Sequence, residues 1–150
     1  MAATRAATVT WNGSLTEGSG TVTAGTSELF MDLPVSWASR TESADGRTSP
    51  EELLAAAHSS CFAMQLSGAL AKAGTPPDHV HVSATVTFDK VDDGWAVTRS
   101  ELDVVGVVPG IDDAAFDAAA QAAKEDCPIS RALADNVELS VSATLEEHHD

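Results

Sequence analysis

The sequence predicts an α+β protein in the order βββ-α-ββ-α-β, with antiparallel strands around one central, buried helix. Three observations support this class. Residues 50–72 are apolar with clear helix start and stop signals, residues 80–88 and 95–108 form a hairpin pattern, and residues 137–145 alternate again. Strict alternation of apolar and polar residues indicates a strand, whereas apolar spacings of three and four indicate a helix. With 150 residues, we expect a single domain, 1–150.

Three strands are expected in the first forty residues. Residues rich in β-branched side chains predict the first strand at Ala7 to Trp11, and the pattern resumes at Thr21 to Thr23 after a turn-rich segment. Leu29 to Trp37 predicts the third strand, and its Pro34 favours an edge or a bulge. Arg40 then stands at the end of the third strand, before a polar loop.

The apolar helix begins with a full set of start signals. Ser49 can cap it, Pro50 suits the first helical position, and Glu51 and Glu52 place negative charge in the first turn. Ser49 and Glu52 also have the spacing of a capping box, and Gly74 marks the end. Few charges interrupt the segment, so we expect it to be buried on most sides. The residues expected to share one face are Leu54, Ala57, Cys61, Met64 and Gly68.

The second half of the chain predicts a hairpin, a second helix and a final strand. Asp92-Asp93-Gly94 is the turn of the hairpin. Asp112 or Asp113 can cap a helix from about 114 to 126, which Pro128 ends before a short turn through 133. The helix residues expected to point inward are Ala115, Phe116, Ala119 and Ala122. The tail at 146–150, with His148 and His149, is polar and is expected to fray.

Charge and composition exclude several classes of function. Lys and Arg total 8 against 23 Asp and Glu, a net charge of −15, which argues against nucleic acid and against anionic membrane surfaces. No run approaches the roughly 20 apolar residues of a membrane span, and the N-terminus lacks a secretion signal, so a cytoplasmic protein is expected. There is no phosphate loop or dinucleotide fingerprint, so we expect no cofactor.

Cys61 and Cys127 are the residues best suited to chemistry. Two cysteines in a reducing compartment are usually inert core residues, less often a redox pair and occasionally metal ligands. Cys61 lies in the middle of the apolar helix, so it is either a packed core thiol or a nucleophile in an apolar pocket. Apolar surroundings raise the pKa of a thiol, and the helix dipole fades within the first turn. A reactive Cys61 therefore needs a cation from elsewhere in the protein.

Arg40 is the best placed cation, since it precedes the loop that leads into the helix, with Arg47 and Arg131 as competitors. Glu51 is ten residues before Cys61, about 15 Å along a straight helix. The two therefore act together only if the helix is broken or a second subunit contributes one of them. Otherwise Glu51 simply supplies charge to the first turn.

Cys127 lies where one helix stops and Pro128 can open the next turn. Helix ends are exposed and deformable, which suits a cysteine that must reach another sulfur, although a buried small residue is the simpler interpretation. His58 and Cys61 are three apart on a helix, but no further Cys/His cluster completes a four-ligand set, so we expect no metal.

Several segments resemble the family of osmotically inducible protein C and organic hydroperoxide resistance proteins. The stretch TSPEELLAAAHSSCF at 48–62 looks like the family signature, and CPIS at 127–130 is similar to its second cysteine segment. DKV at 89–91 and VPGID at 108–112 resemble its connecting regions, so the likeness covers nearly the whole chain. The loop at 12–18 holds no arginine, whereas Arg40 follows the third strand, which matches the osmotically inducible branch.

The resemblance implies an OsmC-like domain that works as an intertwined homodimer and a thiol-dependent peroxidase. Its motif places a peroxidatic cysteine at Cys61, a resolving cysteine at Cys127, the site glutamate at Glu51 and the arginine at Arg40. The implied substrate is an organic hydroperoxide, reduced to an alcohol in defence against oxidative stress, and an external dithiol of lipoyl type regenerates the thiols. The apolar surroundings of Cys61 favour alkyl hydroperoxides over hydrogen peroxide.

Two alternatives stay open. A dimeric ligand-binding or redox-sensor protein of the same fold would carry both cysteines as structural residues. An enzyme with an idle Cys127 would form sulfinic acid on Cys61 and no disulfide.

Overall fold

The computed structural model describes residues 1–147, which form two compact units, one up to Leu53 and one from Leu54 onward. Strands and helices follow one another as predicted, with two additional short helices, so the α+β class is confirmed. The predicted polar tail with His148 and His149 lies, for its last three residues, outside the part that the structure describes.

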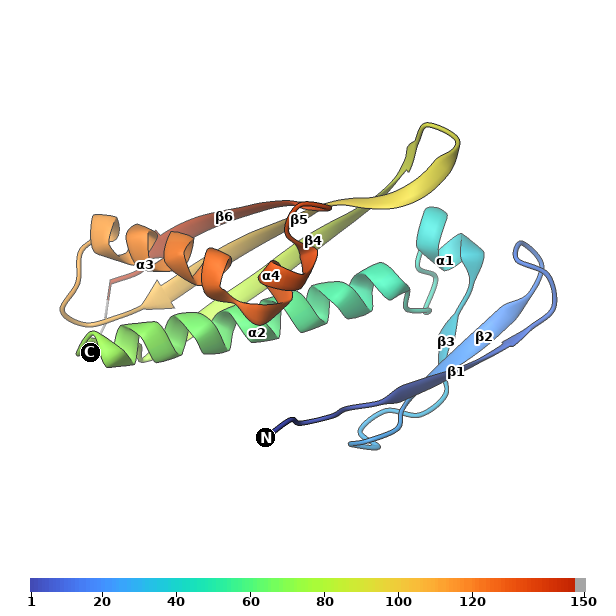
Figure 1. Cartoon of the computed structure of the whole chain (residues 1–150), viewed down its shortest axis with the longest axis horizontal. Coiled ribbons are helices and arrows are strands. Elements are labelled where there is room, and N and C mark those ends of the chain that lie inside the picture. Colours follow the sequence, from blue (N-terminus) through green and yellow to red (C-terminus); the bar gives the residue numbers. More distant parts are fainter. Residues whose placement is uncertain (148–150) are drawn as a thin grey trace. The chain divides into compact units, whose positions relative to one another are not determined.

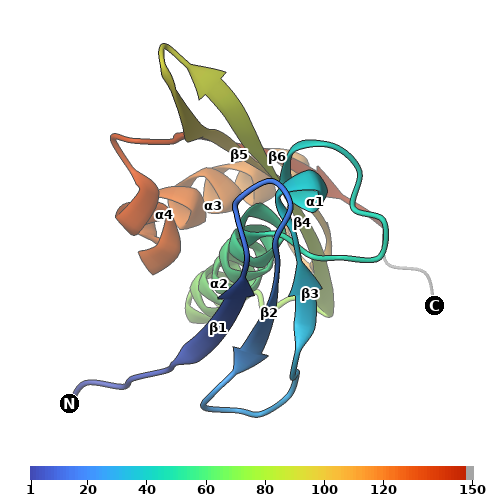
Figure 2. The same cartoon turned by 90° about the vertical axis from the view of Figure 1, so that its right-hand side faces the viewer.

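The first unit is a three-stranded antiparallel sheet in the order β1-β2-β3, whose strands lie side by side in Figure 2. The strands are β1 (Ala7–Asn12), β2 (Ser19–Ala24) and β3 (Leu33–Val35). All six residues of β1 are exposed, whereas β2 buries alternate residues.

The third strand is shorter than predicted, and Arg40 lies in a helix rather than at a strand end. Ser36 ends the strand because its hydroxyl accepts the backbone N–H of Ser39, whose own hydroxyl accepts the backbone N–H of Ser36. This reciprocal capping box starts α1 (Trp37–Thr41) directly after β3. The sequence pattern missed the helix because it lasts five residues.

Most of the second unit is built on the sheet β4-β5-β6. The hairpin of β4 (His79–Val91) and β5 (Gly94–Val107) is antiparallel, as predicted. The pairing of β5 with β6 (Glu138–Leu145) is parallel, and the prediction of an antiparallel sheet is wrong there. A helical connection joins these two strands, and parallel neighbours need such a crossover.

Helix α2 (Pro50–Lys72) begins and ends where the signals predict. The Ser49 hydroxyl accepts the Glu52 backbone N–H at 3.1 Å, and Gly74 takes a positive φ of 92° beyond the last turn. The residues of α2 after Leu53 that are buried lie four apart, and they are His58, Phe62, Leu66 and Leu70. The expected face is therefore wrong in part, since Met64 is 74% exposed. A helix that is apolar nearly all round gives spacing no means of choosing a face.

By length and composition α2 is apolar enough to cross a membrane, contrary to the prediction that no segment approaches this. Core helices of soluble proteins share that property, and α2 contributes Phe62, Leu66 and Leu70 to the core of the second unit. The expectation that α2 is buried on most sides is wrong, since only 22% of its apolar window is buried and one stripe of the helix supplies the core residues.

Helices α3 (Asp113–Asp126) and α4 (Pro128–Leu133) form the crossover between β5 and β6. In Figure 1, α3 runs along the sheet, and its Phe116 packs in the same core cluster as Leu102 and Val104 of β5. Asp112 caps α3 by accepting the Ala115 backbone N–H at 2.8 Å, which confirms one of the two predicted caps. The buried residues of α3 are Phe116, Ala120 and Ala123, and Ala119 packs against the core while partly buried. The predicted inward set is therefore correct for Phe116 and Ala119 and wrong for Ala115 and Ala122, which are exposed.

Candidate functional site

The second unit brings the two cysteines together. Cys61 is half-buried on α2, and Cys127 lies between α3 and α4 with none of its surface exposed. Both thiols are free, and they are close enough that each shifts the pKa of the other. The expectation that Cys127 is exposed at a helix end is wrong. The chain continues from α3 into α4 without a loop, and the junction lies inside the core cluster.

The surroundings of the pair separate the acidities of the two thiols. Burial raises the pKa of the Cys61 thiol, and the neighbouring Cys127 sulfur raises it further. Burial also opposes ionisation of Cys127, but hydrogen bonds from Cys61, from the Ser130 hydroxyl and from the backbone N–H groups of Ile129 and Ser130 outweigh it. The pKa of Cys127 is therefore lowered, because these donors stabilise a negative charge on its sulfur.

A buried hydrogen-bonded cluster lies next to the thiols. His58 is fully buried on α2, with Nδ1 2.6 Å from the Ser100 hydroxyl of β5 and Nε2 2.7 Å from the Ser130 hydroxyl of α4. Burial lowers the pKa of His58, so the ring is neutral at pH 7. Both ring nitrogens are engaged by serines, which leaves neither for the metal considered with Cys61. Sequence reasoning missed this cluster, although a histidine four residues before Phe62 on an apolar stripe is its signal.

The first unit brings together the other two predicted residues. Arg40 Nε is 2.8 Å from Glu51 Oε1, and the guanidinium lies over the Trp37 ring, 5.8 Å from its centroid. Glu51 is 7% exposed, and its Oε2 has no hydrogen-bond partner within residues 1–147. The competitor Arg47 is 3.8 Å from exposed Asp45, and Arg131 is itself exposed.

An apolar cavity of about 550 Å³ opens beside this ion pair in the first unit. Arg40 contributes to a wall that is otherwise almost wholly apolar. Its main apolar lining residues are Val9, Trp11, Leu15, Val35, Trp37 and Leu53. Sequence reasoning did not assign these residues to a site. Trp11 and Leu15, which are 38% and 57% exposed, were the available signal, because large apolar residues at the surface often line binding grooves.

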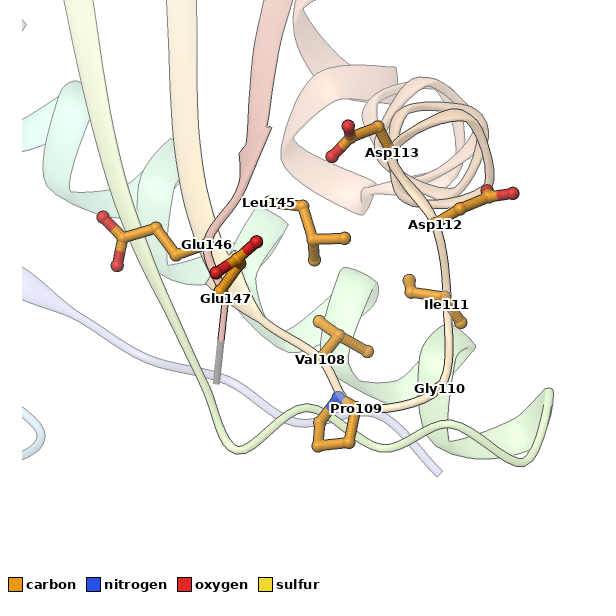
Figure 3. Close-up of a pocket in the computed structure, with 9 residues that line it drawn as sticks. All are labelled: Val108, Pro109, Gly110, Ile111, Asp112, Asp113, Leu145, Glu146 and Glu147. Carbon is orange, nitrogen blue, oxygen red and sulfur yellow. The ribbon is translucent and has the colours of Figure 1, made fainter. Parts of the chain in front are cut away.

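A second cavity, of about 470 Å³, lies in the second unit and contains none of the predicted site residues. Figure 3 shows Val108, Ile111 and Leu145 around its middle, with the carboxylates of Asp112, Asp113, Glu146 and Glu147 at its margin. This arrangement brings no nucleophile together with a base.

The family model and the relatives most similar in sequence point to the same family. Residues 43–142 match the model of the OsmC-like protein family. Proteins named Peroxiredoxin OsmC from Escherichia coli (strain K12) and Shigella flexneri are each 42% identical to the chain over 123 residues. Each match covers 82% of this chain and 85% of the relative.

Solved structures with the same fold include two organic hydroperoxide resistance proteins. OhrB of Bacillus subtilis matches with a TM-score of 0.72 and 24% identity, covering 94% of this chain and 98% of that one. The protein from Elizabethkingia anophelis, solved with thiocyanate bound, matches with a TM-score of 0.76 and 22% identity, covering 97% and 100%. At these identities the likeness is one of fold.

Proposed function

The chain belongs to the OsmC-like protein family, and we propose on that premise that it reduces organic hydroperoxides to alcohols through Cys61 and Cys127. Its identity to proteins named Peroxiredoxin OsmC makes it a cysteine-dependent peroxidase. The observation that carries the proposal is that the second unit brings two free thiols together, with Cys127 in the core cluster and Cys61 packed against that cluster.

The proposed reaction has three steps. The Cys61 thiolate attacks the outer oxygen of the hydroperoxide, so that the O–O bond breaks and Cys61 becomes a sulfenic acid. The alkoxide that leaves takes a proton from water and becomes the alcohol. Cys127 then displaces the sulfenic oxygen and forms a disulfide with Cys61. An external dithiol of lipoyl type reduces the disulfide and is itself oxidised. Hydrogen peroxide reacts in the same way, with water as the leaving product, but more weakly.

Arg40 and Glu51 are proposed to serve Cys61 from a second chain. Cys61 needs a cation because its surroundings raise its pKa, and Glu51 holds the Arg40 guanidinium by an ion pair. Ten residues of helix correspond to about 15 Å, which separates Glu51 from Cys61 of its own chain. An intertwined homodimer removes this separation, and the two units of each chain act in it as one OsmC-like domain.

The cavity beside Arg40 supports the preference for alkyl hydroperoxides. Its lining is almost wholly apolar, and burial of an alkyl chain yields about 25 cal/mol for each Å² of apolar surface. Hydrogen peroxide has no such surface to bury. We place this activity in the cytoplasm, in defence against oxidative stress.

The decisive experiment is the loss of an organic hydroperoxide with dihydrolipoamide as reductant. We compare the intact chain, Cys61→Ser, Cys127→Ser and the control Ser60→Ala, whose exposed hydroxyl bonds only to its own helix. Cys61→Ser is expected to abolish consumption and Ser60→Ala to leave it unchanged. Mass spectrometry of Cys127→Ser after peroxide is expected to show sulfinic acid on Cys61. If the intact chain consumes no peroxide and keeps both thiols free, the ligand-binding alternative replaces the peroxidase.

A further inference from the structure

The cluster of His58, Ser100 and Ser130 places three polar side chains in a core, where burying a polar group costs free energy. All three side chains are at most 1% exposed, and His58 occupies a stripe on α2 whose next members are Phe62, Leu66 and Leu70. Buried polar groups must all be hydrogen-bonded, and an apolar side chain of similar size often stabilises a core equally well. The position of the cluster beside the thiols suggests a reason for keeping a histidine there.

Ser130 connects the cluster to the thiol pair. Its hydroxyl is 2.7 Å from His58 Nε2, and Ser130 lies in the first turn of α4, which Cys127 precedes directly. The same hydroxyl helps to lower the pKa of Cys127. On the other side of the ring, Nδ1 meets only a hydroxyl, that of Ser100 at 2.6 Å. The order of contacts is therefore Ser100, His58, Ser130, Cys127 and Cys61, all within the second unit.

Counting hydrogens fixes what this order of contacts can do. A neutral imidazole has one N–H donor and one bare nitrogen acceptor, and a serine hydroxyl has a single hydrogen. If Nε2 is bare, the Ser130 hydrogen is used on His58 and is not available to Cys127. If Nε2 carries the hydrogen, it donates to the Ser130 oxygen, and the Ser130 hydrogen is free for the sulfur. Ser100 then donates to the bare Nδ1, so that every buried group is satisfied.

We propose that His58 is a positioning residue for the thiol pair: its Nε2–H group holds the Ser130 oxygen, so that the Ser130 hydroxyl is turned to donate to the Cys127 sulfur. The catalytic consequence rests on the proposed function. The Cys127 thiolate attacks the sulfenic sulfur of Cys61, the S–S bond forms as the S–O bond breaks, and the oxygen leaves as hydroxide.

Nitrogen NMR of the reduced chain, labelled with ¹⁵N-histidine, tests the tautomer directly. The ring nitrogen shifts distinguish the two neutral tautomers, and the His58 signals are assigned through the backbone. At a pH where Cys127 is ionised, we expect the hydrogen of His58 on Nε2. A hydrogen on Nδ1 would overturn the proposal, because Nε2 would then be taking the Ser130 hydrogen. A purely structural histidine has no requirement for one tautomer in the thiolate state.

The second measurement is the ultraviolet titration of the Cys127 thiolate in a Cys61→Ser chain, where Cys127 is the remaining thiol. Adding Ser130→Ala is expected to reduce the thiolate fraction below the midpoint about tenfold, since a hydrogen bond to a charged group is lost. Adding Ser60→Ala, a serine of α2 outside the cluster, is expected to change nothing. Equal titration curves for Ser130→Ala and its parent would contradict the proposal.

The two measurements use no peroxide, so they separate this inference from the proposed function. If Ser130→Ala does not fold, the tautomer of the unsubstituted chain still decides the question. If the chain consumes hydroperoxide but His58 carries its hydrogen on Nδ1, the protein is a peroxidase in which His58 does not position Ser130. If the tautomer and the titration are as predicted but the chain consumes no hydroperoxide, the positioning role of His58 stands and the proposed function is wrong.

Discussion

The two units differ in how completely a single chain supplies hydrogen bonds to their buried polar groups and covers their apolar surface. In the second unit, His58 has a hydroxyl on each ring nitrogen, the two free thiols are close to each other, and β5 buries alternate residues against α2 and α3. In the first unit, β1 is exposed along its whole length, an apolar cavity opens to the surface, and Glu51 keeps one buried oxygen without a hydrogen bond among the described residues.

Within residues 1–147, the buried polar groups around the thiols of the second unit are hydrogen-bonded, whereas the first unit has a buried oxygen without a partner and an open apolar cavity. Buried polar atoms normally have partners, and large exposed apolar surfaces normally mark a binding site. Around Arg40, the residue that we propose to act on Cys61 of a second chain, the first unit departs from the first rule at Glu51 and has the exposed apolar surface that the second rule describes. In the second unit, the buried polar side chains beside the thiols all have hydrogen-bond partners. What the proposed reaction still needs there is a cation and a substrate.

The largest effect is expected at the ion pair of the first unit. Arg40→Met removes the charge proposed to stabilise the Cys61 thiolate, and the hydroperoxide consumption rate should fall about 100-fold. Arg47→Met, at an exposed arginine, is the matched control and should keep its rate. Because Arg40→Met leaves Glu51 buried and unpaired, Arg40→Met with Glu51→Gln should recover folding but not activity. Full activity in Arg40→Met would remove Arg40 from the site.

Stability should show the same contrast. Phe62→Ala empties a fully buried position of the second unit and is expected to cost about 3–5 kcal/mol of unfolding free energy. Val9→Ala, on the exposed strand of the first unit, should cost within about 0.5 kcal/mol in a monomer. Urea denaturation measures both. A large cost for Val9→Ala that grows with protein concentration would indicate that a second chain covers β1.

A smaller effect is expected from the buried histidine at acidic pH. Burial lowers the pKa of His58, so below about pH 6.5 the unfolded chain binds a proton that the folded chain refuses. The free energy of unfolding therefore falls as pH drops below about 6.5 and is insensitive to this group above it. The slope that His58 contributes approaches 1.4 kcal/mol per pH unit at most.

His58→Phe should remove this part of the slope in urea denaturation measured across the acidic range. His81→Phe, on the exposed side of β4, is the control and should keep it. Parallel curves for the parent chain and the His58→Phe chain would show that His58 binds its proton equally well in the folded and the unfolded state.

The sequence was sufficient wherever a local signal decides the structure. Ser49 and Gly74 delimit α2 because capping and a left-handed residue act within one turn. The alternation of β4, β5 and β6 predicted all three strands for a similar reason. Arg40 and Glu51 were each predicted as site residues, and they form an ion pair.

Features that depend on distant residues could not be predicted. The parallel pairing of β5 and β6 follows from the path of the crossover, which no pattern within either strand records. Which side of α2 is buried depends on where Phe116 and the sheet lie, because α2 itself is apolar on nearly all sides. The partners of His58 come from β5 and α4, 42 and 72 residues away along the chain.

The parallel pairing of β6 also sets an order of assembly. The hairpin of β4 and β5 closes through a short turn, but β6 must be synthesised and its long crossover closed before Arg99 can pair with Glu138. Helix α3 packs on β6, and Cys127 follows α3 directly. A nascent chain therefore holds both sulfurs well before it can hold them in place, and we expect the reactive pair to mature only once the last strand has left the ribosome.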